Sequence, residues 1–329
     1  MQTHLRSVHF CECWVRYQMK NEQETQSNVH EQPNPQIEQL LNRLLRQPQR
    51  VWRVLEYSSA YMGLIAAAEV ISVMLVLSLP QSTAPLVAGL VTFTIYANDR
   101  LTDVDSDELV NTARSEFVRQ HRQELYILAA MSYGLALTLA ALGGPLAFGL
   151  SVIPGCLWVL YAVDWVPNPT LGFGRLKEIL FLNSALVAAA WAATIVFLPI
   201  AVTEAPIDSA SVVLFLYFFF GTFIGAEVSN VRDVVGDRAI GVATVPVVFG
   251  IHRTRYILQA LNLLNLAILL VALSSSIFSL SALVALATGL VGPAVVIWLL
   301  GRVQNERGLS LALEYSRIPV LITLPILSF

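Results

Sequence analysis

The chain has 329 residues, of which 56% are hydrophobic and 13% are charged, and its formal net charge is −3. A soluble domain carries about 25% charged residues, so this chain has too little charge to cover a water-soluble protein of its length. We therefore predict an integral membrane protein. The negative net charge argues against a nucleic-acid partner, and the 3 scattered cysteines do not suggest a disulfide framework.

The N-terminal region differs from the rest of the chain. Residues 1–36 are rich in Gln, Asn and Glu, which is typical of a disordered polar tail, and no secretory signal pattern is found there. Residues 37–56 place apolar side chains at helical spacing opposite basic ones, which predicts an amphipathic helix at the membrane surface. Its apolar residues are Ile37, Leu40, Leu41, Leu44 and Leu45.

Residues 57–329 form the predicted membrane domain. A spanning helix needs about 20 mostly apolar residues, and nine stretches reach or approach that length. Their continuous apolar runs exclude spanning β-strands, in which polar and apolar residues alternate. We therefore expect an all-α bundle of about nine transmembrane helices. The stretches are 57–79, 83–98, 124–142, 145–163, 178–200, 210–229, 255–273, 277–300 and 309–328.

The basic residues predict the orientation, because Lys and Arg accumulate in cytoplasmic loops. Seven of the 20 precede the first span, and 12 lie in the connections after spans two, four, six and eight. The other four connections contain none, and Arg317 falls inside the ninth span. This alternation predicts a cytoplasmic N-terminus. We expect the protein in the cell inner membrane, with its active site on the cytoplasmic side.

Acidic residues gather at two places, directly after the second and the sixth predicted spans. If the helix continues at the first, Asp99, Asp103 and Asp107 lie on one face, and Asp105 points away. The second group repeats the four-residue spacing. Its residues are Asn230, Arg232, Asp233 and Asp237.

Carboxylates stacked on one face repel each other, which favours a bound cation between them. Mg²⁺ characteristically takes one or two protein carboxylates together with substrate phosphate oxygens. Two such groups on one membrane side, with Arg and Lys nearby, suit a diphosphate bridged to the protein by metal ions. A solvated acidic loop explains either group alone, but it does not explain the repeated spacing.

The first group resembles a motif of the UbiA-type membrane prenyltransferase family, N-D-x-x-D-x-x-x-D followed by N-x-P-x-R. The matching residues are Asn98, Asp99, Asp103, Asp107, Asn111 and Arg114. One extra residue separates Asp99 from Asp103, and Ala113 stands where proline is usual. The extra residue keeps the aspartates on one predicted face, so it alters the subfamily more than the chemistry.

The second group resembles the family's D-x-x-x-D region, and the resemblance extends over residues 50–329. It includes Asn230, Arg232, Asp233, Gly236, Asp237, Gly241, Thr244 and Pro246. Family members have nine transmembrane helices and transfer a polyprenyl group from its diphosphate to an acceptor, with Mg²⁺ required. The resemblance thus implies an isoprenyl diphosphate donor and a lipophilic acceptor, most commonly an aromatic quinone precursor, within membrane lipid.

The same resemblance implies the roles of individual residues. Two Mg²⁺ ions would be held by Asp99, Asp103, Asp233 and Asp237, with Asp107 as a further ligand and Asn98 and Asn230 in support. Arg114 and Lys177, and next Arg175 and Arg232, either contact phosphate directly or are ordinary positive-inside anchors of the membrane domain. Aromatic side chains near the expected active side either stabilise an allylic cation or pack in the core or at the membrane interface. They are Tyr96, Tyr161, Trp165 and Phe223.

Two charged residues lie within predicted spans. Glu69 either contacts the acceptor or is hydrogen-bonded within the bundle, and both interpretations stay open. Arg317 either pairs with an acid or extends to an interface.

Two other functions are compatible with an acidic membrane protein. A cation-coupled transporter would place carboxylates near the middle of the membrane, whereas these motifs follow the ends of spans. A membrane phosphotransferase would carry a D-G-x-x-A-R element, which neither motif contains.

Overall fold

The computed structural model describes residues 50–107, 111–162, 182–240, 242–303 and 306–327. The chain divides into two compact units, Met1–Val54 and Leu55–Phe329. The predicted polar tail and most of the predicted surface helix lie outside the described residues. Within the described part of the chain all regular structure is helical, which confirms the all-α prediction.

The second unit contains the long helices. Each of the first eight predicted spans overlaps one long helix, and the ninth overlaps three consecutive short helices. The elements are α3 (Ala60–Val76), α4 (Ala84–Thr102), α5 (Val104–Asp107), α6 (Thr112–Gln120), α7 (Arg122–Leu142), α8 (Pro145–Ala162), α9 (Leu182–Val202), α10 (Ser209–Ile240), α11 (Val245–Ser274), α12 (Leu280–Leu299), α13 (Glu306–Glu314), the 3₁₀ helix η2 (Tyr315–Arg317) and α14 (Ile318–Leu327).

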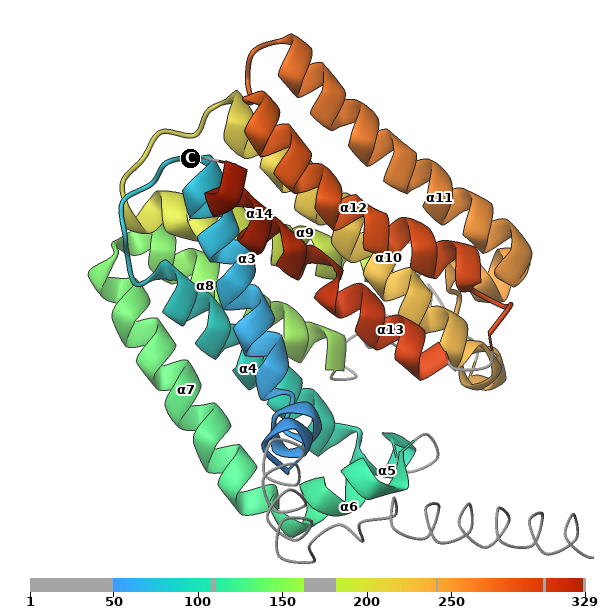
Figure 1. The fold of residues 1–329 in the computed structure, drawn as a ribbon. Helices are drawn as coiled ribbons and strands as arrows, with labels where there is room; N and C mark the ends of the chain where they lie inside the picture. Colours follow the sequence, from blue (N-terminus) through green and yellow to red (C-terminus); the bar gives the residue numbers. More distant parts are fainter. Residues whose placement is uncertain (1–49, 108–110, 163–181, 241, 304–305, 328–329) are drawn as a thin grey trace, which may run out of the picture. The chain divides into compact units, whose positions relative to one another are not determined.

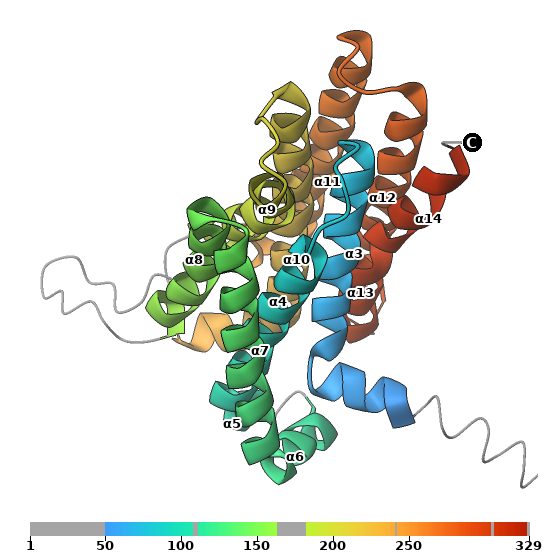
Figure 2. The ribbon, with the colours of Figure 1, turned by 90° about the vertical axis from the view of Figure 1, so that its left-hand side faces the viewer.

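The long helices of this unit follow one another around a closed circuit (Figures 1 and 2). Each packs on the next in the order α3, α4, α7, α8, α9, α10, α11, α12 and α14, and α14 packs back on α3. In addition, α9 contacts both α3 and α4 across the circuit. Helices from the two halves of the chain therefore share an interior.

Small residues allow the first pair of helices to pack closely. A Cβ atom added to Gly63 of α3 would lie 2.6 Å from the carbonyl oxygen of Gly89 in α4, and one added to Gly89 would lie 2.9 Å from the Gly63 oxygen. Small residues at interfaces are typical of membrane helices, because they allow backbones to approach. This contact fixes α4, and with it the first acidic motif, against α3.

Six described helices are long and apolar enough to cross a membrane, and a seventh is added if Arg50–Tyr57 and Ala60–Val76 form one broken span. The helix α8 is apolar but is not long enough to be counted among these six. The last turns of α4 contain the polar residues Asn98, Asp99 and Arg100, which lower its apolar character. The exact number of nine spans therefore stays a prediction. Large apolar side chains are exposed along α7 and α11, as expected for helices that face lipid.

The last predicted span is a broken helix. The structure forms α13, one turn of 3₁₀ helix and then α14. The Ser316 hydroxyl donates to the Leu313 carbonyl oxygen at 2.6 Å, and a Cβ atom on Gly292 of α12 would lie 2.5 Å from Ser316 Cβ. The break therefore packs closely against α12 and directs Arg317 into the interior.

Candidate active site

The first acidic motif does not continue as one helix, which corrects the prediction that Asp99, Asp103 and Asp107 share a helical face. The helix α4 ends at Thr102, and Asp103 is its C-cap, with φ −96° and ψ 16°. A separate short helix, α5, begins at Val104. The Thr102 hydroxyl donates to the Asn98 carbonyl oxygen at 2.9 Å.

The two consecutive residues that open this motif point in different directions. Asp99 lines a cavity between α4, α8 and α9. Asn98 lines open grooves beside α7 and α8 instead, and its amide donates to the Thr94 carbonyl oxygen at 2.9 Å. Asp105 is exposed and pairs with Arg119 at 2.8 Å. The structure thus places Asp99 at an interior cavity, apart from its neighbour.

The second motif remains within a continuous helix, as predicted. The helix α10 extends from Ser209 to Ile240, so Asp233 and Asp237 share a face. Arg232 donates from Nε and Nη2 to the two carboxylate oxygens of Asp233, both at 2.9 Å. The Asn230 amide donates to the Ser184 hydroxyl of α9 at 3.4 Å. In Figure 1 the C-terminal ends of α4 and α10 lie toward the same, lower end of the bundle.

The remaining predicted phosphate ligands are only partly placed. Arg114 is half-buried in the first turn of α6, where Asn111 caps the helix by accepting from the Arg114 backbone N–H at 3.3 Å. Lys177 and Arg175 lie outside the described residues. Asp107 is the last residue of α5.

Of the two cavities that Tyr96, Val187 and Trp191 line, the larger has a volume of about 270 Å³ and a mostly apolar lining. Its walls come from α4, α8 and α9, with Asp99 as the only charged lining residue among the described residues. Such a cavity suits a hydrocarbon chain with a charged group at one end. Its lining residues are Val91, Thr92, Ile95, Tyr96, Asp99, Pro154, Leu157, Trp158, Leu186, Val187, Ala190, Trp191, Thr194 and Ile195.

A smaller cavity of about 120 Å³ lies on the other side of Tyr96, Val187 and Trp191, which line both cavities. Its lining comes from α3, α10, α13 and η2 and is rich in polar and charged groups. Besides the three shared residues, it includes Met62, Ile65, Glu69, Thr222, Gly225, Ala226, Ser229, Ser310, Leu313, Glu314 and Arg317.

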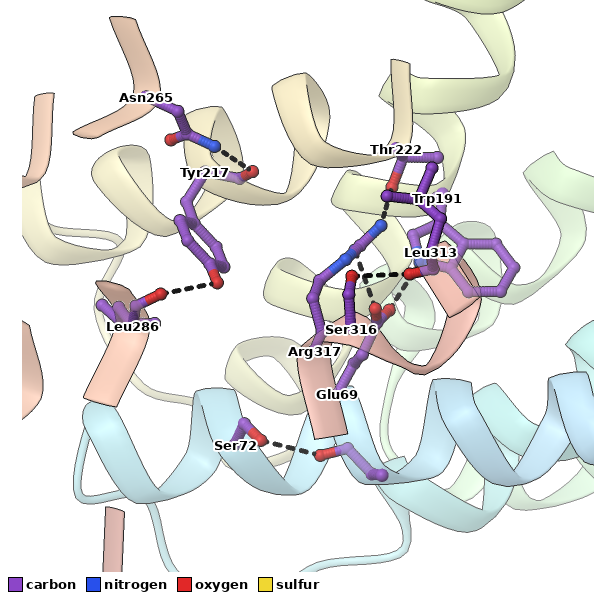
Figure 3. Close-up of polar contacts among 11 residues, drawn as sticks. Glu69, Ser72, Trp191, Tyr217, Thr222, Asn265, Leu286, Leu313, Ser316 and Arg317 are labelled. Atoms are coloured by element: carbon purple, nitrogen blue, oxygen red, sulfur yellow. Dashed lines mark hydrogen bonds and ion pairs between the residues drawn. The ribbon is translucent and has the colours of Figure 1, made fainter. Parts of the chain in front are cut away.

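An ion pair forms one wall of the smaller cavity (Figure 3). Glu69 Oε1 lies 2.7 Å from Arg317 Nη1, and the Trp191 indole N–H donates to Glu69 Oε2 at 2.7 Å. Arg317 Nη2 donates to the Thr222 hydroxyl at 3.3 Å. Glu69 and Arg317, both charged residues of predicted spans, are therefore partners, and Glu69 also holds the Trp191 indole between the two cavities.

Glu314 is a further site residue that the sequence interpretation missed. Its Oε2 accepts the Tyr61 hydroxyl at 2.7 Å. Arg100 of the first motif and Arg232 of the second both interact electrostatically with its carboxyl group. Glu314 thus links the two motifs through charge. The signal that identified Glu69, a carboxyl group within a predicted apolar span, applies equally to Glu314.

Glu227, one turn before Asn230, is also a polar residue of the site region. Its side chain is 1% exposed, and Oε2 accepts the Val245 backbone N–H at 3.2 Å. Val245 is the first residue of α11, where the helix dipole favours a negative charge. Ser184 and Asn230 also hydrogen-bond to the Glu227 carboxyl group. This network joins α9, α10 and α11 directly beside the second motif.

The chemistry of the donor set fits a hard divalent cation, because Asp99, Asp233 and Asp237 offer carboxylate oxygens. Within the described part of the chain, no three His, Cys, Asp or Glu side chains are grouped closely enough to hold a metal ion. Arg232 instead places its cationic guanidinium on both oxygens of Asp233. Asp233 is thus already bound to one positive group, and joint metal binding by the two motifs stays a prediction.

The family model for the UbiA prenyltransferase family matches residues 57–316. Among curated proteins, none matches the chain.

Solved structures share the fold, at 12–18% identity. The apo form of a UbiA homologue from Aeropyrum pernix K1 is 16% identical, with a TM-score of 0.59 over 82% of this chain and 96% of that one. A UbiA homologue from Archaeoglobus fulgidus bound to GPP and Mg²⁺ is 14% identical, and the match, with a TM-score of 0.59, covers 84% of this chain and 99% of that one. A digeranylgeranylglyceryl phosphate synthase is 18% identical, and the match, with a TM-score of 0.54, covers 82% of this chain and 98% of that one.

Proposed function

Because the chain belongs to the UbiA prenyltransferase family, we propose that it transfers a prenyl group from a prenyl diphosphate to a lipophilic acceptor. The observation that carries this proposal is the larger cavity, which is apolar along its length and has Asp99 in its lining. A prenyl diphosphate has the same division between an apolar chain and a charged end. The homologue of similar fold from Archaeoglobus fulgidus binds GPP with Mg²⁺.

We further propose that Asp99, Asp103, Asp233 and Asp237 hold Mg²⁺ against the diphosphate. When bound, Mg²⁺ would neutralise the charge that develops on the leaving diphosphate. Arg232, which binds Asp233 at 2.9 Å, is close enough to the motif to contact a phosphate oxygen after releasing that carboxylate. Guanidinium groups bind phosphate as readily as carboxylate.

The cavity walls have a separate role. Departure of diphosphate leaves an allylic cation, which water would destroy. The aliphatic lining from α4, α8 and α9 excludes water from the chain, and Tyr96 and Trp191 present aromatic rings that are 6.2 Å apart. Such rings stabilise cations placed over their faces. The acceptor, by this proposal, attacks from the side of the smaller cavity.

The membrane arrangement proposed with this function has nine spans and a cytoplasmic N-terminus, as the alternation of basic connections predicts. It is supported by the closed circuit of long helices, which includes α4 and α8 as full members. Both acidic motifs then lie at the cytoplasmic ends of their helices.

The test is prenyl transfer by the full-length protein in lipid nanodiscs. Tritiated geranylgeranyl diphosphate is supplied with a mixed panel of hydroxylated aromatic and glycerol acceptors, with and without Mg²⁺, and both product and diphosphate are measured. We expect Mg²⁺-dependent product that is lost in Asp233→Asn and retained in Asp105→Asn, an identical change at an exposed residue of the first motif. If neither product nor released diphosphate is detected with any donor chain length, the result favours the transporter alternative.

A further inference from the structure

A buried acid of α10 caps the start of a different helix. The N-cap residue of α11, Thr244, makes no capping hydrogen bond with its own side chain. The first four N–H groups of an α-helix have no partner within that helix, and here the Val245 N–H donates to Glu227 Oε2 at 3.2 Å. The Glu227 side chain is 1% exposed. One oxygen of this buried carboxyl group is therefore occupied by α11.

The same carboxyl group determines how the Asn230 amide is turned. Asn230 lies one turn after Glu227 on α10. Its amide nitrogen donates to the Ser184 hydroxyl of α9 at 3.4 Å, and the Asn230 and Ser184 side chains both hydrogen-bond to the Glu227 carboxyl group. An ionised carboxylate accepts hydrogen bonds and donates none. The amide therefore has to present its nitrogen, not its oxygen, to Glu227.

The oxygen of the same amide is left for another partner. In a planar amide the nitrogen and the oxygen lie on opposite sides of the carbon that carries them. With the Asn230 nitrogen turned toward Glu227 and Ser184, its oxygen is turned away from them, and none of the hydrogen bonds described for Asn230 uses it. Asn230, Asp233 and Asp237 are three and seven positions apart on a continuous helix, so they share one face.

The orientation of an amide decides whether it can bind a hard cation. Carbonyl oxygens, like carboxylate oxygens, suit Mg²⁺, whereas the NH₂ group of an amide only donates hydrogen bonds. An Asn230 side chain turned the other way would direct its N–H groups at the metal. Groups that orient a metal ligand in this manner typically change metal affinity by about 10–100-fold when they are replaced.

We propose that Glu227 is a positioning residue of the metal site, which turns the Asn230 amide so that its carbonyl oxygen joins Asp233 and Asp237 as a ligand for Mg²⁺. This inference rests on the proposed function and specifies the support of the same site. Glu227 itself touches neither metal nor substrate, because its oxygens are occupied by Val245, Ser184 and Asn230. Its effect on the metal passes through the orientation of Asn230.

Replacing the acid by its amide tests the orientation. In Glu227→Gln the new side-chain oxygen still accepts the Val245 N–H, but its NH₂ group then faces Asn230, which turns its own oxygen toward it. Full-length protein in nanodiscs is titrated with Mg²⁺ in the presence of tritiated geranyl diphosphate, and the melting temperature of each sample is measured. We expect the Mg²⁺ concentration for half-maximal donor binding to rise at least about tenfold.

Exchanging the acid and the amide supplies the rescue. In the double variant Glu227→Gln with Asn230→Asp, one oxygen of the new carboxylate accepts from the glutamine, and the other faces the metal. We expect this variant to recover most of the lost Mg²⁺ affinity. Asn230→Asp alone places two carboxyl groups one turn apart, so it should be the least stable of the three proteins. Glu204→Gln, the same change in an exposed connection, is the control and should alter neither quantity.

The outcomes separate a positioning role from a structural one and from the proposed function. An unchanged Mg²⁺ requirement in Glu227→Gln, or a Mg²⁺ requirement that only follows the melting temperature through the series, would overturn the positioning role alone. Absence of Mg²⁺-dependent donor binding in the wild type would overturn the proposed function itself. Should Glu227→Gln fail to fold, the double variant decides, since a raised Mg²⁺ requirement in that protein would contradict the rescue.

Discussion

Arg232 and Asp233, adjacent in sequence, form a two-pronged ion pair in which Nε and Nη2 of the arginine donate to the two carboxylate oxygens at 2.9 Å. By the proposed mechanism the same carboxylate binds Mg²⁺. The guanidinium and the metal therefore compete for Asp233. The side chains are 30% and 39% exposed, so the pair contributes about 1 kcal/mol or less.

This competition predicts two opposite effects of Arg232→Gln. The Mg²⁺ concentration for half-maximal donor binding should fall up to about fivefold, because 1.4 kcal/mol corresponds to about tenfold. Donor affinity at saturating Mg²⁺ should fall as well, because a proposed phosphate ligand is lost. Titrations with tritiated geranyl diphosphate measure both quantities, with Arg238→Gln, an exposed arginine of the same helix, as control. An unchanged Mg²⁺ requirement would contradict the competition.

The ion pair between Glu69 and Arg317 predicts a strong dependence of stability on both partners. Glu69→Gln should destabilise the fold by about 3–5 kcal/mol, because it leaves a buried charge without its partner. The double variant Glu69→Gln with Arg317→Met should recover most of that loss, since the amide oxygen still accepts the Trp191 N–H. Thermal unfolding in detergent compares the three proteins. If the double variant is no more stable than the single one, the ion pair is not the cause.

The close contact of α3 and α4 predicts that Gly63 tolerates no side chain. Gly63→Ala should cost about 1–3 kcal/mol, because the new Cβ atom would overlap backbone rather than a flexible side chain. Gly134→Ala in α7 is the matched control. A Cβ atom there meets nothing within 4 Å, so the higher helix propensity of alanine should leave stability equal or greater. Equal melting temperatures for the two variants would show that the helices can separate at no cost.

The start of α10 predicts a pH-dependent contribution from Asp208. Its Oδ1 accepts the Ser211 backbone N–H at 2.9 Å and the Ser211 hydroxyl at 2.9 Å. These hydrogen bonds, above all that from the Ser211 backbone, lower the pKa of the Asp208 carboxyl group. Because the folded pKa lies below the unfolded value of about 3.9, the contribution is present above that value and is lost as the pH falls through the folded pKa.

Asp208→Ala should therefore cost about 1 kcal/mol at pH 7, the usual loss for an N-cap, and less at pH 3. Asp208→Asn retains a capping oxygen that does not titrate, so its effect should change little between the two values. Melting temperatures of the three proteins at both values test this. A penalty for Asp208→Ala that stays constant with pH would show that the ionised carboxylate is not the stabilising form.

Much of the fold is readable from the sequence, because apolar length alone requires helices in a membrane. The second motif was also predictable in shape. It follows an uninterrupted apolar run, and α10 continues through Asp233 and Asp237. The first motif was not, since spacing alone cannot show that α4 ends at Thr102, with Asp103 as its C-cap.

Contacts between residues that are distant in the sequence also could not be predicted. Glu69 and Arg317 were each recognisable as costly charges within spans, but only the packing of α14 and η2 beside α3 shows that they compensate each other. Glu314 could have been identified by the same rule as Glu69. Its contact with Tyr61 depends on the break between α13 and α14, which periodicity did not predict.

The order in which the chain is synthesised gives the closed circuit of helices a further consequence. Glu69 enters the membrane with the first long helix of the circuit, whereas Arg317 is synthesised 248 residues later, directly before the helix that packs back on α3. Throughout insertion the carboxyl group has to be accommodated by the translocon, by lipid head groups or by its own protonation. A chain truncated before Arg317 would carry an uncompensated acid in α3, so this single pair distinguishes such a truncated chain from one that includes Arg317.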